Sequence, residues 1–133
     1  MSDDVALGNS GQDAVLAERG TQAVLDDHLR LRMAHDVESD IARNYAPEVV
    51  MLTSVGKREG HEAVRDYAKI LKEHVPPDYE VVVKHVSGRF AFIEWRAREP
   101  GRSVEDGADS FVVENGKIVF QSIHYTLMET MPQ

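Results

Sequence analysis

Apolar positions recur every three or four residues in three segments of the N-terminal part of the chain. This spacing gives a helix one apolar face, so it predicts three helices. They are expected over residues 12–34, 36–45 and 61–74. Gly20 is a weak point in the first helix, and Asp36 is a suitable N-cap for the second. Pro76 and Pro77 end the third, because the residue before a proline is pushed out of the helical region.

Beyond these prolines the pattern changes to an alternation of apolar and polar positions, which is typical of strands. Gly88 and Gly116 separate alternating runs at points where hairpin turns need a positive φ. Four strands are therefore expected over residues 79–87, 90–99, 107–114 and 117–127, after an earlier short strand over residues 49–53. Helices followed by a four-stranded meander predict an α+β fold, with the helices packed on a curved antiparallel sheet.

The composition fits a globular protein. The chain has 133 residues, of which 42% are apolar and 29% are charged, a balance that argues against disorder of the whole chain. Residues 1–11 are expected to form a flexible N-terminal arm, ahead of a single domain over residues 12–133. There is no cysteine and no apolar run of the roughly 20 residues that cross a bilayer. The acidic start does not read as a secretory signal, so a cytoplasmic protein is expected.

The formal net charge is −8, from 23 acidic and 15 basic side chains. An acidic surface repels phosphate, and the basic residues are scattered, so neither nucleic acid nor an anionic membrane is expected as a partner. The glycine-rich motifs of nucleotide-binding loops and the H-E-x-x-H motif of zinc sites are absent from the sequence. The histidines lack the spacing of metal ligands. No cofactor and no metal site are expected.

Three local phrases, and their order, resemble a known family. Asn44-Tyr45-Ala46-Pro47-Glu48-Val49-Val50 is similar to that family's passage from helix to strand. Gly60-His61-Glu62-Ala63-Val64-Arg65 is similar to the start of its next helix. The final hairpin, with Asp109 followed by the turn Asn115-Gly116-Lys117-Ile118, also resembles the family's. Over residues 12–127 the chain thus resembles the SnoaL-like branch of the nuclear-transport-factor-2-like superfamily.

The resemblance implies a cone, in which the sheet curls around a helix and leaves a pocket for a small, largely apolar molecule. The superfamily includes ketosteroid isomerase, polyketide cyclases, limonene-epoxide hydrolase and scytalone dehydratase. It also includes members without catalysis, which serve as transport adaptors or association modules, so the fold does not decide the function. A homodimer through the sheet is expected as well, because this superfamily often builds its dimers there.

The strand predicted over residues 90–99 has two distinct faces, since successive side chains point to opposite sides. We expect the charged face to line the pocket and the apolar face to form the dimer interface. The opposite assignment, in which Ile93 and Trp95 line the core, stays open. The expected pocket face comprises Phe90, Phe92, Glu94 and Arg96, and the expected outer face comprises Ala91, Ile93, Trp95 and Ala97.

Asp109 is the first candidate for chemistry. The resemblance places it where ketosteroid isomerase has an oxyanion-hole carboxylic acid, which an apolar site keeps protonated. The rest of that site does not carry over. The position of its general base falls near Thr53, and the first helix has no tyrosine at the other donor position. The alternative role for Asp109 is a structural ion pair with Arg96 across neighbouring strands.

Glu94, Arg96 and Asp109 form the predicted catalytic group. An arginine between two carboxylates can hold them in different protonation states, which acid–base chemistry requires. The group is similar to that of limonene-epoxide hydrolase, although the order of the acid and the arginine along the strand is reversed. The alternative is an ion-pair network with a structural role.

The other candidates are ligand-binding side chains. His28 and His85 can carry protons near neutral pH, but each can equally be a hydrogen-bonded core residue. Tyr67 on the third helix has the same two interpretations. The full predicted ligand-binding set is His28, Thr53, Tyr67, His85, Phe92, Phe111, Gln121 and Tyr125.

The inward face of the last strand depends on the preceding turn. A three-residue loop with a bulge brings Gln121 and Tyr125 beside Asp109, whereas a two-residue loop brings Ser122 and His124 there. We favour the first, because an aromatic ring and its apolar neighbours suit a pocket wall.

These observations support an enzyme that performs acid–base chemistry without a cofactor, as an isomerase, cyclase, dehydratase or epoxide hydrolase. Two alternatives stay open. One is a ligand-binding protein without catalysis, and the other is a dimeric interaction module whose cone is filled by side chains.

Overall fold

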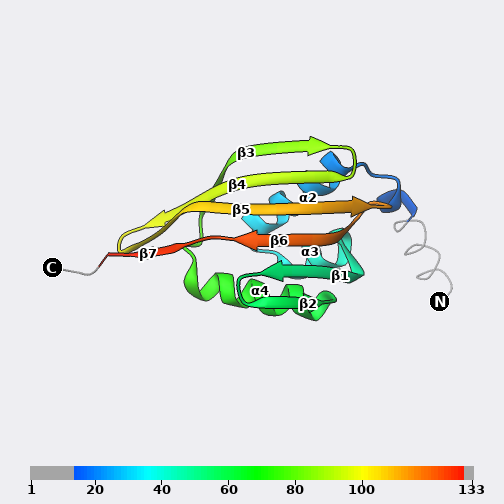
Figure 1. Cartoon of the computed structure of the whole chain (residues 1–133). Coiled ribbons are helices and arrows are strands. Elements are labelled where there is room, and N and C mark those ends of the chain that lie inside the picture. The colour runs from blue at the N-terminus through cyan, green and yellow to red at the C-terminus, as the bar shows by residue number, and fades with distance from the viewer. Residues whose placement is uncertain (1–13, 131–133) are drawn as a thin grey trace.

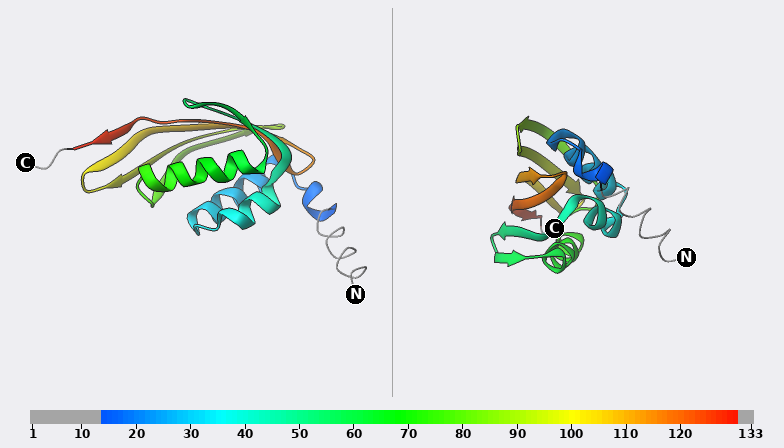
Figure 2. Two further views of the ribbon diagram at one scale, coloured as in Figure 1. Left: turned by 90° about the horizontal axis from the view of Figure 1, so that it is seen from below. Right: turned by 90° about the vertical axis from the view of Figure 1, so that its right-hand side faces the viewer.

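The computed structural model describes residues 14–130. In this part of the chain, helices α2 (Thr21–Met33), α3 (Val37–Asn44) and α4 (His61–His74) lie on one side of a curved sheet (Figures 1 and 2). This arrangement confirms the predicted α+β cone. The arm predicted over residues 1–11 lies outside the described residues. None of the described helices is long and apolar enough to cross a membrane.

The described residues form a seven-stranded sheet with the order β2-β1-β6-β5-β4-β3, and β7 pairs with β5. The strands are β1 (Tyr45–Thr53), β2 (Gly56–Glu59), β3 (Tyr79–Ser87), β4 (Phe90–Glu99), β5 (Arg102–Glu114), β6 (Lys117–His124) and β7 (Leu127–Glu129). β1 runs parallel to β6, so the sheet is mixed and not purely antiparallel as predicted. Parallel neighbours need a long crossover, and here the crossover consists of β2, α4 and the strands β3 to β5 (Figure 1).

The helix boundaries follow the local signals in the sequence. The helix predicted over residues 12–34 is interrupted, and α2 begins only after Gly20. α3 begins after Asp36, whose carboxylate accepts a hydrogen bond from the Ser39 amide at 3.1 Å. This is the predicted cap, and it satisfies one of the amides that a helix start leaves without a partner. α4 has the predicted bounds.

The strands differ from the prediction where the sequence does not alternate. β1 begins at Tyr45, four residues before the predicted strand, and forms a hairpin with the unpredicted β2. All four residues of β2 are exposed and polar or glycine, so no apolar period marks this strand. β5 begins at Arg102 and not at residue 107, because its first residues also pair with β4 and β7.

A bulge in β6 decides which of its side chains face the helices. Val112 pairs with Phe120 and not with Val119, so Val119 is an extra residue in the strand. A shift of one residue exchanges the two faces of a strand. The predicted placement of Gln121 on the same face as Asp109 is therefore confirmed, although the turn has two residues and the bulge lies after it.

Arg19 fastens the helices to the turn between β5 and β6. Its guanidinium donates hydrogen bonds to Asn44 Oδ1, to the Arg43 carbonyl and to the Gly116 carbonyl, each at 2.9 Å. Burial lowers the pKa of Arg19 from its ordinary value. Such charge-assisted bonds are among the stronger ones in proteins. They join the start of α2, the end of α3 and the sheet into one unit.

Gly107 makes room for a large side chain of the core. It pairs with Trp95 across β5 and β4, and a Cβ at this position would overlap the indole ring. We expect Gly107→Val to lower the free energy of unfolding by about 1–3 kcal/mol through overpacking. The midpoint temperature of thermal unfolding, followed by circular dichroism, should fall by several degrees.

Gly20→Ser is the matched control for this prediction. A Cβ at Gly20 meets no atom within 4 Å, and serine is a favoured N-cap. Its unfolding temperature should equal or exceed that of the wild type. Equal stability of the wild type and Gly107→Val would contradict the close fit between Gly107 and the indole.

Candidate functional site

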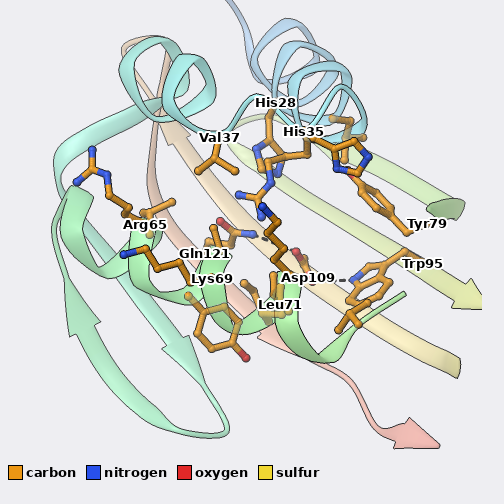
Figure 3. A pocket seen from close by; sticks show the side chains of 18 of the residues that line it. His28, His35, Val37, Arg65, Lys69, Leu71, Tyr79, Trp95, Asp109 and Gln121 are labelled. Atoms are coloured by element: carbon orange, nitrogen blue, oxygen red, sulfur yellow. Dashed lines mark hydrogen bonds between the residues drawn. The ribbon is translucent and has the colours of Figure 1, made fainter. Parts of the chain in front are cut away.

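A cavity of about 730 Å³ lies between the helices and the concave face of the sheet. Its walls come from α2, α3, α4 and five neighbouring strands, and Figure 3 shows side chains from the helices and from the sheet directed into it. The volume is in the range typical of ligand sites, about 300–1,000 Å³. Its wall is largely apolar, with contributions from Leu29, Met51, Val64, Ala68, Leu71, Val75, Ile93 and Ile123.

Asp109 is the carboxylate in the sheet wall of the cavity. Its Oδ1 accepts a hydrogen bond from Trp95 Nε1, and its Oδ2 accepts one from Gln121 Nε2, both at 3.0 Å (Figure 3). Both donors are neutral. Burial raises the pKa of Asp109 above its ordinary value, although the two hydrogen bonds act in the opposite direction. Burial therefore stabilises the neutral form of this carboxyl group relative to water, and that form can donate as well as accept.

Gln121 connects this carboxyl to a buried tyrosine. The Tyr45 hydroxyl donates a hydrogen bond to Gln121 Oε1, while the amide nitrogen of Gln121 donates to Asp109. Tyr45 is 1% exposed, and burial raises its pKa well above the ordinary value. Tyr45 therefore stays protonated, and its hydroxyl, which can donate or accept, remains a partner for either orientation of the Gln121 amide.

A second polar group comes from the helices. His28 of α2 is 4% exposed and Asp40 of α3 is fully buried. His28 Nδ1 lies 2.8 Å from Asp40 Oδ2, and Asn44 Nδ2 donates to Asp40 Oδ1 at 2.9 Å. The imidazole ring packs edge-on against Tyr45 and Phe111, with ring centroids 5.7 and 5.4 Å apart. These contacts hold the ring in one position in the cavity wall.

Positive charge surrounds the mouth of the cavity. Arg32 Nη1 lies 3.8 Å from Asp40 Oδ2 and reaches the cavity wall. Lys69 and Lys72 of α4 are exposed at the rim, and among the described residues neither has an ion-pair partner. Arg65, also at the rim, is paired with Glu38. The exposed Asp36 also lines the cavity, so the opening has more basic than acidic side chains although the whole chain has a net charge of −8.

The structure contradicts the expected faces of β4. Ala91, Ile93, Trp95 and Ala97 are buried in the core, and Ile93 and Trp95 line the cavity. The apolar face packs on the helices because it removes more apolar surface from water than the charged face would. The dimer interface predicted from these four residues is therefore wrong.

Glu94 and Arg96 accordingly point away from the cavity. Arg96 Nη2 pairs with Glu80 Oε1 at 2.8 Å on the outer face of the sheet, and neither Glu94 nor Arg96 lines the cavity. Asp109 is bound by Trp95 and Gln121 instead. The predicted catalytic group of Glu94, Arg96 and Asp109 does not exist, and neither does the alternative ion pair between Arg96 and Asp109.

The same reversal removes two ligand-binding candidates. His85 pairs with Phe92 across β3 and β4, and both side chains lie on the outer face, where His85 is exposed and Phe92 is partly exposed. Neither residue lines the cavity. Phe92 lies on the outer face because side chains alternate along β4 and it is two residues from Glu94. His85 lies on the same face because it is paired with Phe92.

The structure distributes the other candidates over three environments. His28, Tyr67 and Gln121 line the cavity together with Asp109. Thr53 and Tyr125 do not line it but neighbour the Tyr67 hydroxyl, whose pKa burial raises above its ordinary value. Phe111 is 2% exposed and lies behind His28 in the core.

Sequence reasoning missed the partners that give the site its character. No motif in the sequence marks Asp40, Tyr45 or Arg32 as part of the site, and the expected faces of residues 90–99 place Trp95 outside it. A usable signal for Asp40 was its spacing, since an acid four residues before Asn44 can share one helix face with it. Trp95 carried an indole donor that a buried site would satisfy.

The helices, the curved sheet and the open cavity between them give this chain the cone-shaped fold of nuclear-transport-factor-2-like proteins. The SnoaL-like domain model matches residues 25–121 of the chain. The chain therefore belongs to the SnoaL-like domain family. No curated protein matches the sequence.

Solved structures share this fold at low sequence identity. An NTF2-like protein of unknown function from Mesorhizobium loti is 21% identical, with a TM-score of 0.68 and coverage of 80% of this chain and 90% of that one. A protein from Kribbella flavida, provisionally named a ketosteroid isomerase, is 15% identical, with a TM-score of 0.66 and coverage of 85% and 82%. A protein from Sinorhizobium meliloti, provisionally named a polyketide cyclase, is 19% identical, with a TM-score of 0.63 and coverage of 76% and 93%. At these identities the likeness shows the fold alone.

The raised pKa of Asp109 predicts how a variant changes stability with pH. The folded state favours the neutral acid, so the stability from this group is complete below the unfolded pKa, about 3.9, and is lost as the pH rises through the folded pKa. Asp109→Asn removes this loss, and a flipped Gln121 amide can accept from the new side-chain nitrogen. We expect the variant to unfold at a higher temperature than the wild type at pH 7–8, with the difference shrinking below about pH 4.

Asp106→Asn is a control of opposite sign. Asp106 is exposed, and hydrogen bonds from the Thr126 amide and hydroxyl, both at 2.8 Å, lower the pKa of its carboxyl. Its substitution should slightly lower the unfolding temperature at neutral pH. Calorimetry of the three proteins between pH 3 and 8 provides the comparison. A wild type more stable than Asp109→Asn at pH 8, with equal stability at pH 3, would show that Asp109 is held ionised in the fold.

Proposed function

We propose that this protein binds a small, largely apolar molecule in the cavity and that Asp109 acts on it as an acid in proton-transfer chemistry. The observation that carries the proposal is the placement of Asp109. It is a cavity-lining carboxyl group with two neutral donors and a raised pKa. A neutral carboxyl in an apolar site can donate a hydrogen bond to a ligand oxygen and stabilise negative charge that develops there.

A ligand with a carbonyl oxygen fits this site best. A donor such as the Asp109 carboxyl is most useful to a reaction in which a carbonyl oxygen gains negative charge. Isomerisation and aldol-type cyclisation are reactions of this kind. The names of the Kribbella flavida and Sinorhizobium meliloti structures point to the same two chemistries in those proteins.

The shape and charge of the cavity narrow the ligand further. Apolar side chains form most of the wall, so a ring system of moderate size would gain free energy by leaving water. Lys69, Lys72 and Arg32 surround the opening. A polar or acidic group at the outer end of the ligand would face these cations, and the carbonyl group would lie at the inner end near Asp109.

A thermal-shift screen followed by turnover assays tests this function. The panel contains steroid and aromatic polyketide-like ketones, terpenoid epoxides and small organic acids. A ligand at 100 times its Kd stabilises the fold by about 2.7 kcal/mol, which raises the unfolding temperature visibly. Asp109→Asn keeps the shape of the side chain but has no acidic proton. We expect it to bind the same ketone and to lose about 100-fold or more in turnover.

Glu94→Gln is the control, because Glu94 lies on the outer face and does not touch the cavity. It should turn over at the wild-type rate. Turnover by Asp109→Asn at the wild-type rate would remove Asp109 from the chemistry. A hit without turnover in any protein would favour the alternative, a ligand-binding protein without catalysis.

A homodimer through the outer face of the sheet is a second proposal. An apolar row crosses four strands there, because Val50 pairs with Phe120, Phe120 with Val112, and Val112 with Phe90. Phe90 is 53% exposed, and Leu52 beside the row is 41% exposed. A contiguous exposed apolar surface of this kind is typical of interaction sites. It takes the place of the interface predicted from the residues now found in the core.

Analytical ultracentrifugation tests the dimer. We expect the wild type to sediment as a dimer at micromolar concentration and Phe90→Glu to sediment as a monomer, because the new charge would be buried at the interface. Val55→Glu is the matched control, since Val55 is 75% exposed in the turn between β1 and β2, away from the row. A monomeric wild type contradicts the proposal.

A further inference from the structure

Asp40 fixes the tautomer of His28. An ionised carboxylate only accepts hydrogen bonds, so the nitrogen that lies 2.8 Å from Asp40 Oδ2, His28 Nδ1, must carry a hydrogen. Asn44 Nδ2 donates to the other carboxylate oxygen. Arg32, 3.8 Å from the same carboxylate, supplies a permanent positive charge that balances Asp40.

The second nitrogen of the ring opens to the cavity. His28 lines the cavity, and Nε2 has no hydrogen-bond partner among the described residues. Every fully buried side-chain nitrogen and oxygen in this part of the chain has a partner, so Nε2 must be accessible. Since His28 is only 4% exposed, that access is through the cavity. In the Nδ1–H tautomer, Nε2 presents a lone pair to whatever occupies the space.

Two proton-active groups thus face one cavity from opposite walls. Figure 3 shows His28 extending from the helical wall, and Asp109 and Gln121 lying on the sheet wall. The aromatic rings of Tyr45 and Phe111 hold the imidazole in place. Asp40 does not line the cavity, because it is fully buried behind the imidazole ring of His28.

We propose that His28 is the proton acceptor of this site and Asp40 its positioning residue, and that the substrate is a ketone with an acidic hydrogen on the carbon next to its carbonyl group. This inference rests on the proposed function, in which Asp109 binds the carbonyl oxygen. It adds a base from a different element of the fold.

The proton transfer balances within the site. His28 Nε2 takes the hydrogen from the α-carbon as a proton, and the C–H electron pair becomes a carbon–carbon double bond. The π electrons of the carbonyl move to its oxygen, which receives the hydrogen bond or the proton of Asp109. Asp40 stabilises the imidazolium that forms. The imidazolium then returns its proton to another carbon, or the enolate carbon attacks a second carbonyl, whose oxygen takes the imidazolium proton. In both cases the first carbonyl re-forms and Asp109 keeps or regains its proton, so no oxidant or cofactor is consumed.

The first test is the tautomer of His28 in the full-length protein. Long-range proton–nitrogen NMR spectra of ¹⁵N-histidine-labelled protein distinguish the two ring nitrogens, and His28→Gln assigns the signal. We expect a neutral ring with hydrogen on Nδ1 at pH 7.5. Asp40→Asn should shift the signal toward a mixture of tautomers. If Asp40 only supported the packing of the helices, the tautomer of His28 would not change. A ring with hydrogen on Nε2, or a doubly protonated ring, overturns the inference.

The second test uses 2-tetralone, an apolar ketone with acidic α-hydrogens, as the probe. Its α-hydrogens exchange with deuterium in D₂O, and proton NMR measures the rate. We expect the wild type to accelerate this exchange and His28→Gln to lose about 100-fold or more of the acceleration. His85→Gln, on the exposed outer face, should exchange at the wild-type rate. Asp40→Asn, which keeps the His28 imidazole, should lose activity while still binding the ketone.

The outcomes separate this inference from the proposed function. If Asp109→Asn loses the exchange activity while His28→Gln keeps the wild-type rate, His28 is not the proton acceptor. The proposed function of Asp109 would still stand. A wild type that binds 2-tetralone without exchanging its hydrogens also overturns the inference. Failure of every ketone to bind counts against the proposed function, and the tautomer then decides the role of His28 alone.

Discussion

The helical half of this protein depends on the interactions of one buried carboxylate, that of Asp40. It has no exposed surface, and it accepts from His28 and Asn44 while Arg32 lies close by. A buried charge is tolerated only when hydrogen bonds and an opposite charge compensate for its lost hydration. Because the compensating groups come from α2 and α3, satisfying the charge also sets the position of the two helices. Asn44 extends the network to Arg19 and the sheet.

The two walls of the cavity have different electrostatic character. On the helical wall, charges are present and balanced, with Asp40 against Arg32. On the sheet wall, the polar partners are uncharged. Trp95 and Gln121 donate hydrogen bonds to Asp109, Tyr45 donates to Gln121, and none of the three can form an ion pair with the carboxyl group. Carboxyl groups in two such different environments are the usual arrangement for acid–base work. Here the separation follows from the fold, since helices and sheet contribute one group each.

Most of the fold could be predicted from the sequence, because periodicity, capping and turn signals are local. The bounds of α4 and the Asp36 cap follow directly from such signals. The site was harder to predict, because the period of two along β4 defines two faces without saying which is inward. Glu94 and Arg96 were expected to be catalytic because they are charged. The face with Ile93 and Trp95 is inward instead, because its burial removes more apolar surface from water. The link from His28 to Asp40 joins two helices, so no local pattern could have shown it.

The parallel pairing of β1 with β6 also bears on the order in which the chain folds. The two strands are joined through a helix and four further strands, so closing this pair costs more chain entropy than forming any hairpin of the meander. The hairpins of β3 to β6 are the contacts expected to form early, and the attachment of β1 with its helices to be late. On a ribosome, the edge of β1 that pairs with β6 then stays unpaired until β6 has emerged. His28 and Asp109 come together only at that late step.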